Sequence, residues 1–142
     1  TEAMQKDGFN PQTFAYPHGD NTSALDKELL KYFKNIRKII APYLNKSLVD
    51  MDQIYLNRKN VTVFFAAGID ARYHHTDEEI IEALVKAKNS RQTVSLYCHF
   101  LSKDGSPLEA SQSHISEERF KKIILKAKDL GLTFYTASDL SP

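Results

Sequence analysis

The chain has 142 residues, of which 42% are hydrophobic, and this is enough for one domain with a buried core. The formal net charge is +1, so charge gives no reason to expect a nucleic-acid or membrane-surface partner. No apolar run approaches the roughly 18 residues that a membrane-spanning helix needs. The single cysteine, Cys98, excludes an internal disulfide, and its place in an apolar segment favours a packing role.

Short β-prone segments alternate with segments whose apolar residues recur at helical spacing. Strands joined by helices favour right-handed crossovers and a parallel sheet. We therefore predict an α/β fold in which functional groups gather at the carboxyl ends of the strands. The predicted strands are residues 13–16, 36–40, 61–66, 93–99 and 133–136.

Three helices are predicted between these strands. The first covers residues 24–33, with its leucines and a phenylalanine on one face. Thr76 and Glu79 form a capping box at the start of the second, which runs to about residue 88. Ser116 caps the third helix, and Gly131 ends it.

Two stretches predict loops. Residues 46–60 have no clear period, and we expect only a short element around residues 52–56. Residues 103–113 are rich in serine, glycine and proline, which predicts a mobile surface loop. His114 follows this loop, and we expect it to be exposed to solvent.

A turn ends the first predicted strand. Pro17 fixes its own φ near about −65° and favours an extended Tyr16, while Gly19 can adopt backbone angles closed to other residues. Such a turn at the carboxyl end of a strand presents backbone N–H groups to a ligand oxygen. The turn is therefore a candidate for binding an oxyanion.

Three segments, in this order, resemble motifs of the polysaccharide deacetylases (carbohydrate esterase family 4). Residues 14–19, Phe-Ala-Tyr-Pro-His-Gly, are similar to the family's F-x-x-P-[YF]-G turn. Residues 96–99, Leu-Tyr-Cys-His, are similar to a strand ending L-x-x-H. A last helix and residues 131–136, Gly-Leu-Thr-Phe-Tyr-Thr, are similar to the family's closing helix and strand. The resemblance extends from about Gly8 to Leu140 and corresponds to the carboxyl half of the family's catalytic domain.

The resemblance implies an incomplete (β/α) barrel of parallel strands, with residues 1–142 as the carboxyl-terminal part of a longer deacetylase-like domain. It implies a carbohydrate substrate, removal of an acetyl group from an N-acetylated sugar, and an extracellular or cell-envelope location. The family uses a divalent metal, zinc or similar, held by an aspartate and two histidines. Those ligands belong to motifs that precede the turn. This sequence has no Asp-Asp pair and no H-x-x-x-H to replace them, so we expect no metal ligand here and an inactive isolated chain.

The resemblance also implies roles for single residues. His99 would be the general acid that protonates the leaving amine, a role suited to imidazole. His18 would be catalytic through its backbone N–H, which stabilises the oxyanion, while its side chain forms part of the pocket wall. Asp70 or Arg72 would supply polar function that the family places in a tryptophan-bearing motif. The predicted substrate-binding residues are Tyr16, Pro17, Gly19, Leu96 and Asp70.

One departure from the family leaves alternatives open. Ala15 stands where many members carry an arginine that orients the catalytic base. A non-catalytic carbohydrate-binding or scaffold relative is therefore an alternative, and a plain α/β interaction domain is another. The deacetylase interpretation requires the turn and His99 to lie at one rim. Exposed strand edges would also permit a homo-oligomer.

Overall fold

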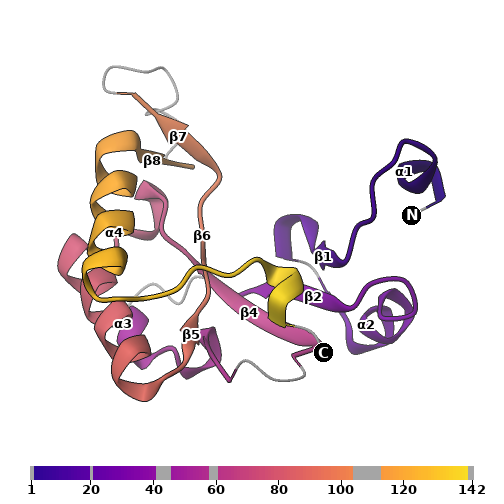
Figure 1. Cartoon of the computed structure of the whole chain (residues 1–142), viewed down its shortest axis with the longest axis horizontal. Helices are drawn as coiled ribbons and strands as arrows, with labels where there is room; N and C mark the ends of the chain where they lie inside the picture. The colour runs from indigo at the N-terminus through magenta and orange to yellow at the C-terminus, as the bar shows by residue number, and fades with distance from the viewer. Residues whose placement is uncertain (1, 20, 41–45, 58–60, 104–112, 141–142) are drawn as a thin grey trace.

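A curled, parallel, four-stranded sheet forms the centre of the computed structural model, which describes residues 2–19, 21–40, 46–57, 61–103 and 113–140 (Figure 1). The architecture is mixed α/β with a parallel sheet, as the alternation of strands and helices predicted, and the sheet curls as half a barrel, which is consistent with the incomplete barrel that the resemblance implied. Within this four-stranded sheet, each pair of neighbouring strands is parallel. The strand order is β1 (Thr13–Ala15), β2 (Asn35–Ile39), β4 (Val63–Gly68) and β6 (Leu96–Tyr97).

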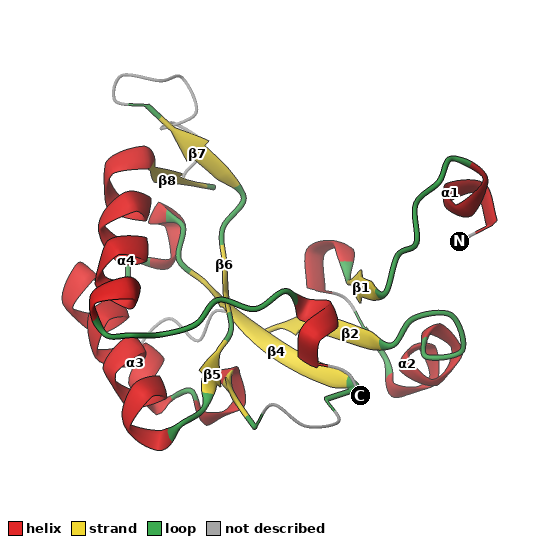
Figure 2. Ribbon diagram, in the orientation of Figure 1, coloured by secondary structure: helices red, strands yellow, loops and turns green. Residues whose placement is uncertain are grey.

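Two long helices, α3 (Asp77–Ser90) and α4 (Glu117–Asp129), lie side by side against one face of this sheet (Figure 2). The predicted capping box of α3 is present, with Thr76 and Glu79 each bonded to the other's backbone. Ser116 caps α4, as predicted. Two shorter helices are α1 (Glu2–Lys6) and α2 (Ser23–Leu29). The latter ends earlier than predicted, and beyond it the N–H groups of Lys31 and Tyr32 donate to carbonyls only three residues back, as in a tighter turn.

Side chains alternate between the two faces of the sheet. One face, which we call the outer face, packs against α3 and α4 and includes Phe65, Ala67 and Leu96. The opposite face, which we call the inner face, carries the residues that alternate with these along each strand. Its members include Ala15, Arg37, Phe64, Gly68 and Tyr97. At its amino end this inner face is covered by the helical turn η6 (Ala137–Leu140).

The predicted strand over residues 93–99 is divided in two. β5 (Thr93–Val94) pairs antiparallel with β3 (Tyr55–Leu56), while β6 pairs with β4. Ser95 joins the two because its N–H donates to the carbonyl of Ile54 and its own carbonyl accepts from Ala67. His99 therefore lies just beyond β6 rather than inside a strand.

The predicted strand over residues 133–136 is wrong. No strand is described there, and Phe134 is exposed. Thr136 instead donates from both its backbone N–H and its hydroxyl to the carboxylate of Asp139, which starts η6. Local capping of η6 has replaced strand pairing.

Sequence patterns missed a small parallel pair, β7 (Phe100–Ser102) and β8 (His114–Ser116). The pairing buries His114 to 9% exposure, so the prediction of an exposed histidine is wrong. β8 packs against the turn η4 (Ala71–Tyr73) and the start of α4, which removes this side chain from solvent. Residues 104–112, most of the predicted mobile loop, lie outside the described residues.

The predicted loop over residues 46–60 contributes to the core. Its described part contains two helical turns, η2 (Leu48–Asp50) and η3 (Asp52–Ile54), followed by β3. Leu48 and Ile54 are fully buried in the main core. None of the helices in the described ranges is long and apolar enough to cross a membrane.

Candidate functional site

A buried carboxylate and a half-exposed imidazole form a pair at the carboxyl ends of β4 and β6. The Oδ2 atom of Asp70 lies 2.7 Å from Nδ1 of His99, and Oδ1 accepts from the His99 backbone N–H at 2.9 Å. The Asp70 side chain has no exposed surface, whereas 42% of the His99 side chain is exposed. One carboxylate therefore fixes both the backbone and the ring of this histidine.

This pairing determines what the imidazole can do. An ionised carboxylate only accepts hydrogen bonds, so the contact places the ring proton on Nδ1. Nε2 is then left to give or take a proton with a ligand, as in oriented histidines of hydrolytic enzymes. The arrangement is suited to general acid–base chemistry.

Strand register brings the two residues together. Gly68 and Tyr97 are paired Cα partners in β4 and β6, and each chain continues two residues further to Asp70 and His99. The backbone N–H of Ile69 donates to the Tyr97 carbonyl at 2.9 Å, which extends the pairing towards the site. Both residues thus leave the sheet at the same level and on the inner face.

Two tyrosines pack beside the Asp70–His99 pair. The hydroxyls of Tyr73 and Tyr97 lie 2.7 Å apart, and the Tyr97 ring meets the His99 ring edge-on at 5.5 Å between centroids. Gly68 permits this packing, because a Cβ at that position would collide with the Tyr73 ring. Burial, followed by the hydrogen bond with Tyr73, raises the pKa of Tyr97, so this hydroxyl stays protonated.

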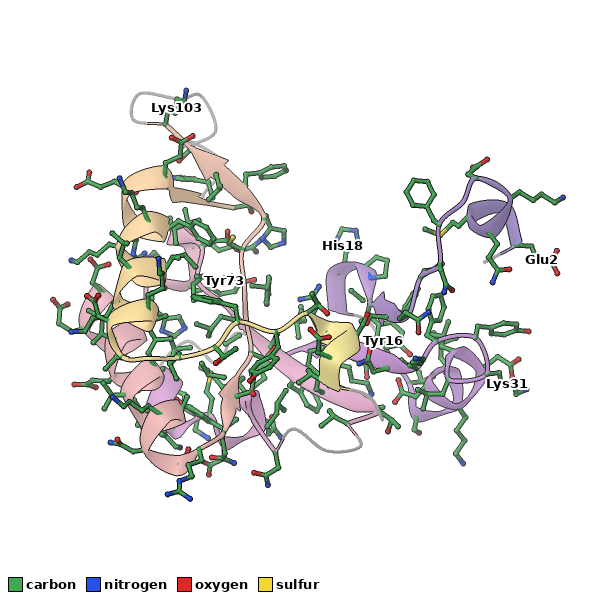
Figure 3. All side chains as sticks on the ribbon, in the orientation of Figure 1. Glu2, Tyr16, His18, Lys31, Tyr73 and Lys103 are labelled. Carbon is green, nitrogen blue, oxygen red and sulfur yellow. The ribbon has the colours of Figure 1, made fainter. Side chains whose placement is uncertain are left out.

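The predicted turn follows β1 at the same edge of the sheet. Residues Pro17–Gly19 form one turn of 3-10 helix in which His18 has φ 55° and Gly19 has φ 81°. A positive φ was expected at Gly19 but not at His18. The side chains of Pro17 and His18 are exposed, and His18 projects from the turn in Figure 3.

The turn and His99 share an edge but are not adjacent. They follow β1 and β6, the two edge strands of the sheet, with β2 and β4 between them. Three strand spacings of about 4.8 Å place these strand ends roughly 14 Å apart along the sheet. Curling of the sheet would bring them closer across the inner face.

Two predicted substrate-binding residues belong to the outer face. Leu96 packs into the main core between the sheet and the long helices. Tyr16 is only 4% exposed, and its hydroxyl donates to Asp26 at 2.8 Å. Burial and the Asp26 hydrogen bond raise the pKa of Tyr16 to about 12. Neither side chain faces the Asp70–His99 pair.

The Tyr16 hydroxyl is part of a buried ion-pair network under α2. Lys38 Nζ lies 2.6 Å from Asp26 Oδ2, with side chains 10% and 13% exposed. Burial acts to raise the pKa of Asp26, but the hydrogen bonds from Lys38 and Tyr16 outweigh it and hold that pKa below its usual value. The network ties the turn after β1 to β2.

Arg37 is an inner-face residue that sequence reasoning did not single out. Its Cζ lies 4.8 Å from the centroid of the Tyr97 ring, a cation–π contact. The sequence signal for this placement is the alternation of side chains along residues 35–39, which puts Arg37 on the same face as Tyr97.

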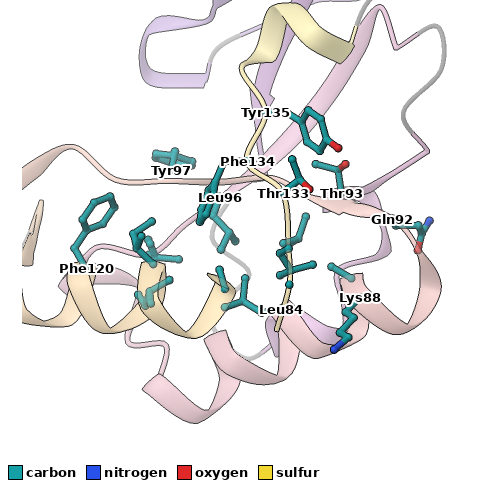
Figure 4. Close-up of a pocket in the computed structure, with 18 of the residues that line it drawn as sticks. Leu84, Lys88, Gln92, Thr93, Leu96, Tyr97, Phe120, Thr133, Phe134 and Tyr135 are labelled. Carbon is teal, nitrogen blue, oxygen red and sulfur yellow. The ribbon is translucent and has the colours of Figure 1, made fainter. Parts of the chain in front are cut away.

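A cavity of about 510 Å³ lies between the sheet and the long helices (Figure 4), and Tyr97 but not His99 is among its lining residues. It is lined mainly by apolar side chains of α3, α4, residues 93–98 and the segment after Gly131. Lys88 and Gln92 lie towards one end and Phe120 towards the other. Cys98 also lines this cavity, and burial raises the pKa of its thiol, in keeping with a packing role.

The described residues do not provide a metal centre of their own. Across residues 2–19, 21–40, 46–57, 61–103 and 113–140, no three His, Cys, Asp or Glu side chains are grouped so that they could hold an ion. The donor set at the inner face, one imidazole already bonded to one carboxylate, does not fit the Asp-His-His ligation that the family resemblance implies. We assign no metal ligand to this part of the chain.

Comparisons with protein-family models, curated proteins and solved structures found no match to this chain. Functional inference therefore depends on the residues and geometry described above.

Proposed function

We propose that this chain takes part in hydrolysing acetamido groups on a poly- or oligosaccharide, as a polysaccharide deacetylase-like protein. The observation that carries the proposal is the 2.7 Å contact between His99 Nδ1 and the buried Asp70 carboxylate. It leaves Nε2 of a solvent-accessible ring to act on a substrate. The motif resemblance supplies the reaction class.

In the proposed reaction His99 serves as general acid. The amide C–N bond breaks, Nε2 gives its proton to the departing sugar nitrogen, and water supplies the second oxygen of the released acetate. The Asp70 carboxylate stabilises the positive ring before transfer and keeps its orientation. In the turn at residues 17–19, the backbone N–H of His18 would be the donor to the oxyanion, because Pro17 has no N–H and the Gly19 N–H donates to the Tyr16 carbonyl.

Water activation is the part of the reaction that this proposal leaves to other groups. In the family a divalent metal and a second aspartate do this, and the described residues form no such centre. We therefore expect the 142-residue chain alone to release no acetate from N-acetylglucosamine oligomers with added zinc. Binding, rather than turnover, is the direct readout for this chain.

The test is a titration of the isotope-labelled chain with N-acetylglucosamine tetramer, followed by amide NMR. We expect saturable shifts at His99, Gly19 and Tyr73, and weaker shifts with the deacetylated glucosamine tetramer. His99→Gln should weaken binding, while His74→Asn, at an exposed position that favours asparagine, should not. Absence of saturable shifts at the inner face would refute the proposal.

A carbohydrate-binding relative without catalysis is the second candidate. Ala15 favours it, because the resemblance expects an arginine at that position in many active members. This candidate predicts the same binding but equal affinity for the acetylated and deacetylated tetramers, since no group would need to recognise the acetyl.

A further inference from the structure

We propose that Arg37 is an anion-binding residue of the inner face and that its ligand is a small monocarboxylate. Arg37 lies on β2 with Ala15 of β1 and Phe64 of β4 as its paired neighbours. This inference goes beyond the deacetylase proposal and does not depend on it, because it concerns an anion rather than an acetamide.

The Arg37 guanidinium lacks a counter-ion within the described part of the chain. No carboxylate pairs with it, and its Nη1 is buried without a hydrogen-bond partner. Among the described residues its other nitrogens have no hydrogen-bond partner either, and the Arg37 residue as a whole is only half-buried. The next cation along the strand, Lys38, has Asp26 as its partner. A buried charged donor without an acceptor is unfavourable, so this position favours an incoming negatively charged acceptor.

The surroundings hold the guanidinium in place, and its neighbour on β1 is a small residue. Its cation–π contact with Tyr97 restrains the plane of the group. Ala15, opposite Arg37 in the register, contributes only a methyl group. The same Tyr97 ring also contacts the His99 ring, so guanidinium and imidazole both border one aromatic side chain. A ligand bound at Arg37 would lie next to the Asp70–His99 pair.

The charge and shape of the group favour a monocarboxylate. Two adjacent N–H donors of a guanidinium match the two oxygens of a planar carboxylate. A doubly charged phosphate would call for a second cation. Lys38 faces the other side of the sheet and is paired. Arg72 is exposed, stacks on Tyr73 and donates to Ser113.

The test uses sodium acetate as the probe, titrated into the 142-residue chain at constant ionic strength set with sodium chloride. We expect saturable shifts of the Arg37 side-chain N–H signals. Arg37→Met, which keeps the apolar stem, should weaken acetate binding about ten- to a hundredfold. Arg37→Lys should bind with intermediate affinity because it keeps the charge without the planar fork. Arg72→Met should bind acetate as the unmodified chain does.

A stability measurement separates ligand binding from a structural role. Arg37→Met removes an unpaired charge, so urea unfolding should show a midpoint equal to or above that of the unmodified chain. A markedly lower midpoint would show that Arg37 is structural and overturn the proposal. Shifts that do not saturate, or that persist in Arg37→Met, would also overturn it. Tighter binding of inorganic phosphate than of acetate would refute the carboxylate assignment, whatever the sugar titration shows.

Discussion

Replacing Asp70 with asparagine should change which nitrogen of His99 carries the proton. The backbone N–H of His99 can only donate, so it will orient the new amide with its oxygen towards that N–H. The amide NH₂ then faces Nδ1, 2.7 Å away in the unmodified chain. Two donors cannot share that contact, so Nδ1 must become the acceptor and the proton must move to Nε2.

The cost in stability should be small enough for the variant to fold. The substitution exchanges a hydrogen bond to a charged group for a neutral one, a difference of about 1–2 kcal/mol. The His99 side chain is 42% exposed, which favours the lower figure, about 1 kcal/mol, because solvent competes for the contact. With a urea m-value of about 2 kcal/mol/M, the unfolding midpoint should fall by roughly 0.5 M.

Long-range proton–nitrogen NMR spectra of the imidazole rings, recorded at alkaline pH, distinguish the two tautomers. We expect the Nδ1–H form of His99 in the unmodified chain and the Nε2–H form in Asp70→Asn, with the signals of His74 unchanged as an internal control. If both chains show the same His99 tautomer, the carboxylate does not set the ring proton and the general-acid argument fails.

Three further predictions concern stability. Lys38→Met should cost about 3–5 kcal/mol by leaving Asp26 buried without its cation, and pairing it with Asp26→Leu should recover much of that in urea titrations. Gly68→Ala should cost about 1–3 kcal/mol, because the added methyl meets the Tyr73 ring; unchanged thermal unfolding would contradict this. Burial lowers the pKa of His75, so the unfolded chain binds its proton more readily, and stability should fall as the pH drops from 7 through about 6.5. His75→Gln should flatten that pH profile, and an equally steep profile in the variant would assign the effect to another group.

Local signals predicted much of the fold. The capping box at Thr76 and Glu79, the Ser116 cap and the turn at Pro17 each depend on residues within one or two turns of chain, and all three are present. The parallel sheet followed from the alternation of elements. These features need no knowledge of distant partners.

Features that depend on distant partners were missed. The break at Ser95 arises because its two backbone groups bond to different strands, which local β propensity does not reveal. Residues 133–136 have a strand-like composition, but the N–H and hydroxyl of Thr136 donate to Asp139 at the start of η6. The burial of His114 likewise depends on β7, the parallel partner of its own strand.

The candidate site was likewise predicted where local signals suffice and missed where distant residues meet. The sequence indicated His99 through the motif resemblance and placed Asp70 near a strand end, but only strand register shows that they are partners. Arg37 carried no local signal beyond alternation, because its proposed role depends on the lack of a counter-ion among the described residues. Tyr16 and Leu96 lie beside motif residues in sequence, yet alternation directs their side chains to the outer face.

The left-handed backbone at His18 has a consequence for which residues that position can accept. His18 has φ 55° and ψ 0°, and it supplies the remaining N–H of this turn, because Pro17 has no N–H and the Gly19 N–H donates to the Tyr16 carbonyl. Main-chain angles, rather than the imidazole, set the direction of that N–H. Asparagine or glycine at residue 18 should preserve it, whereas valine or isoleucine would force the chain out of the left-handed region and turn the donor away.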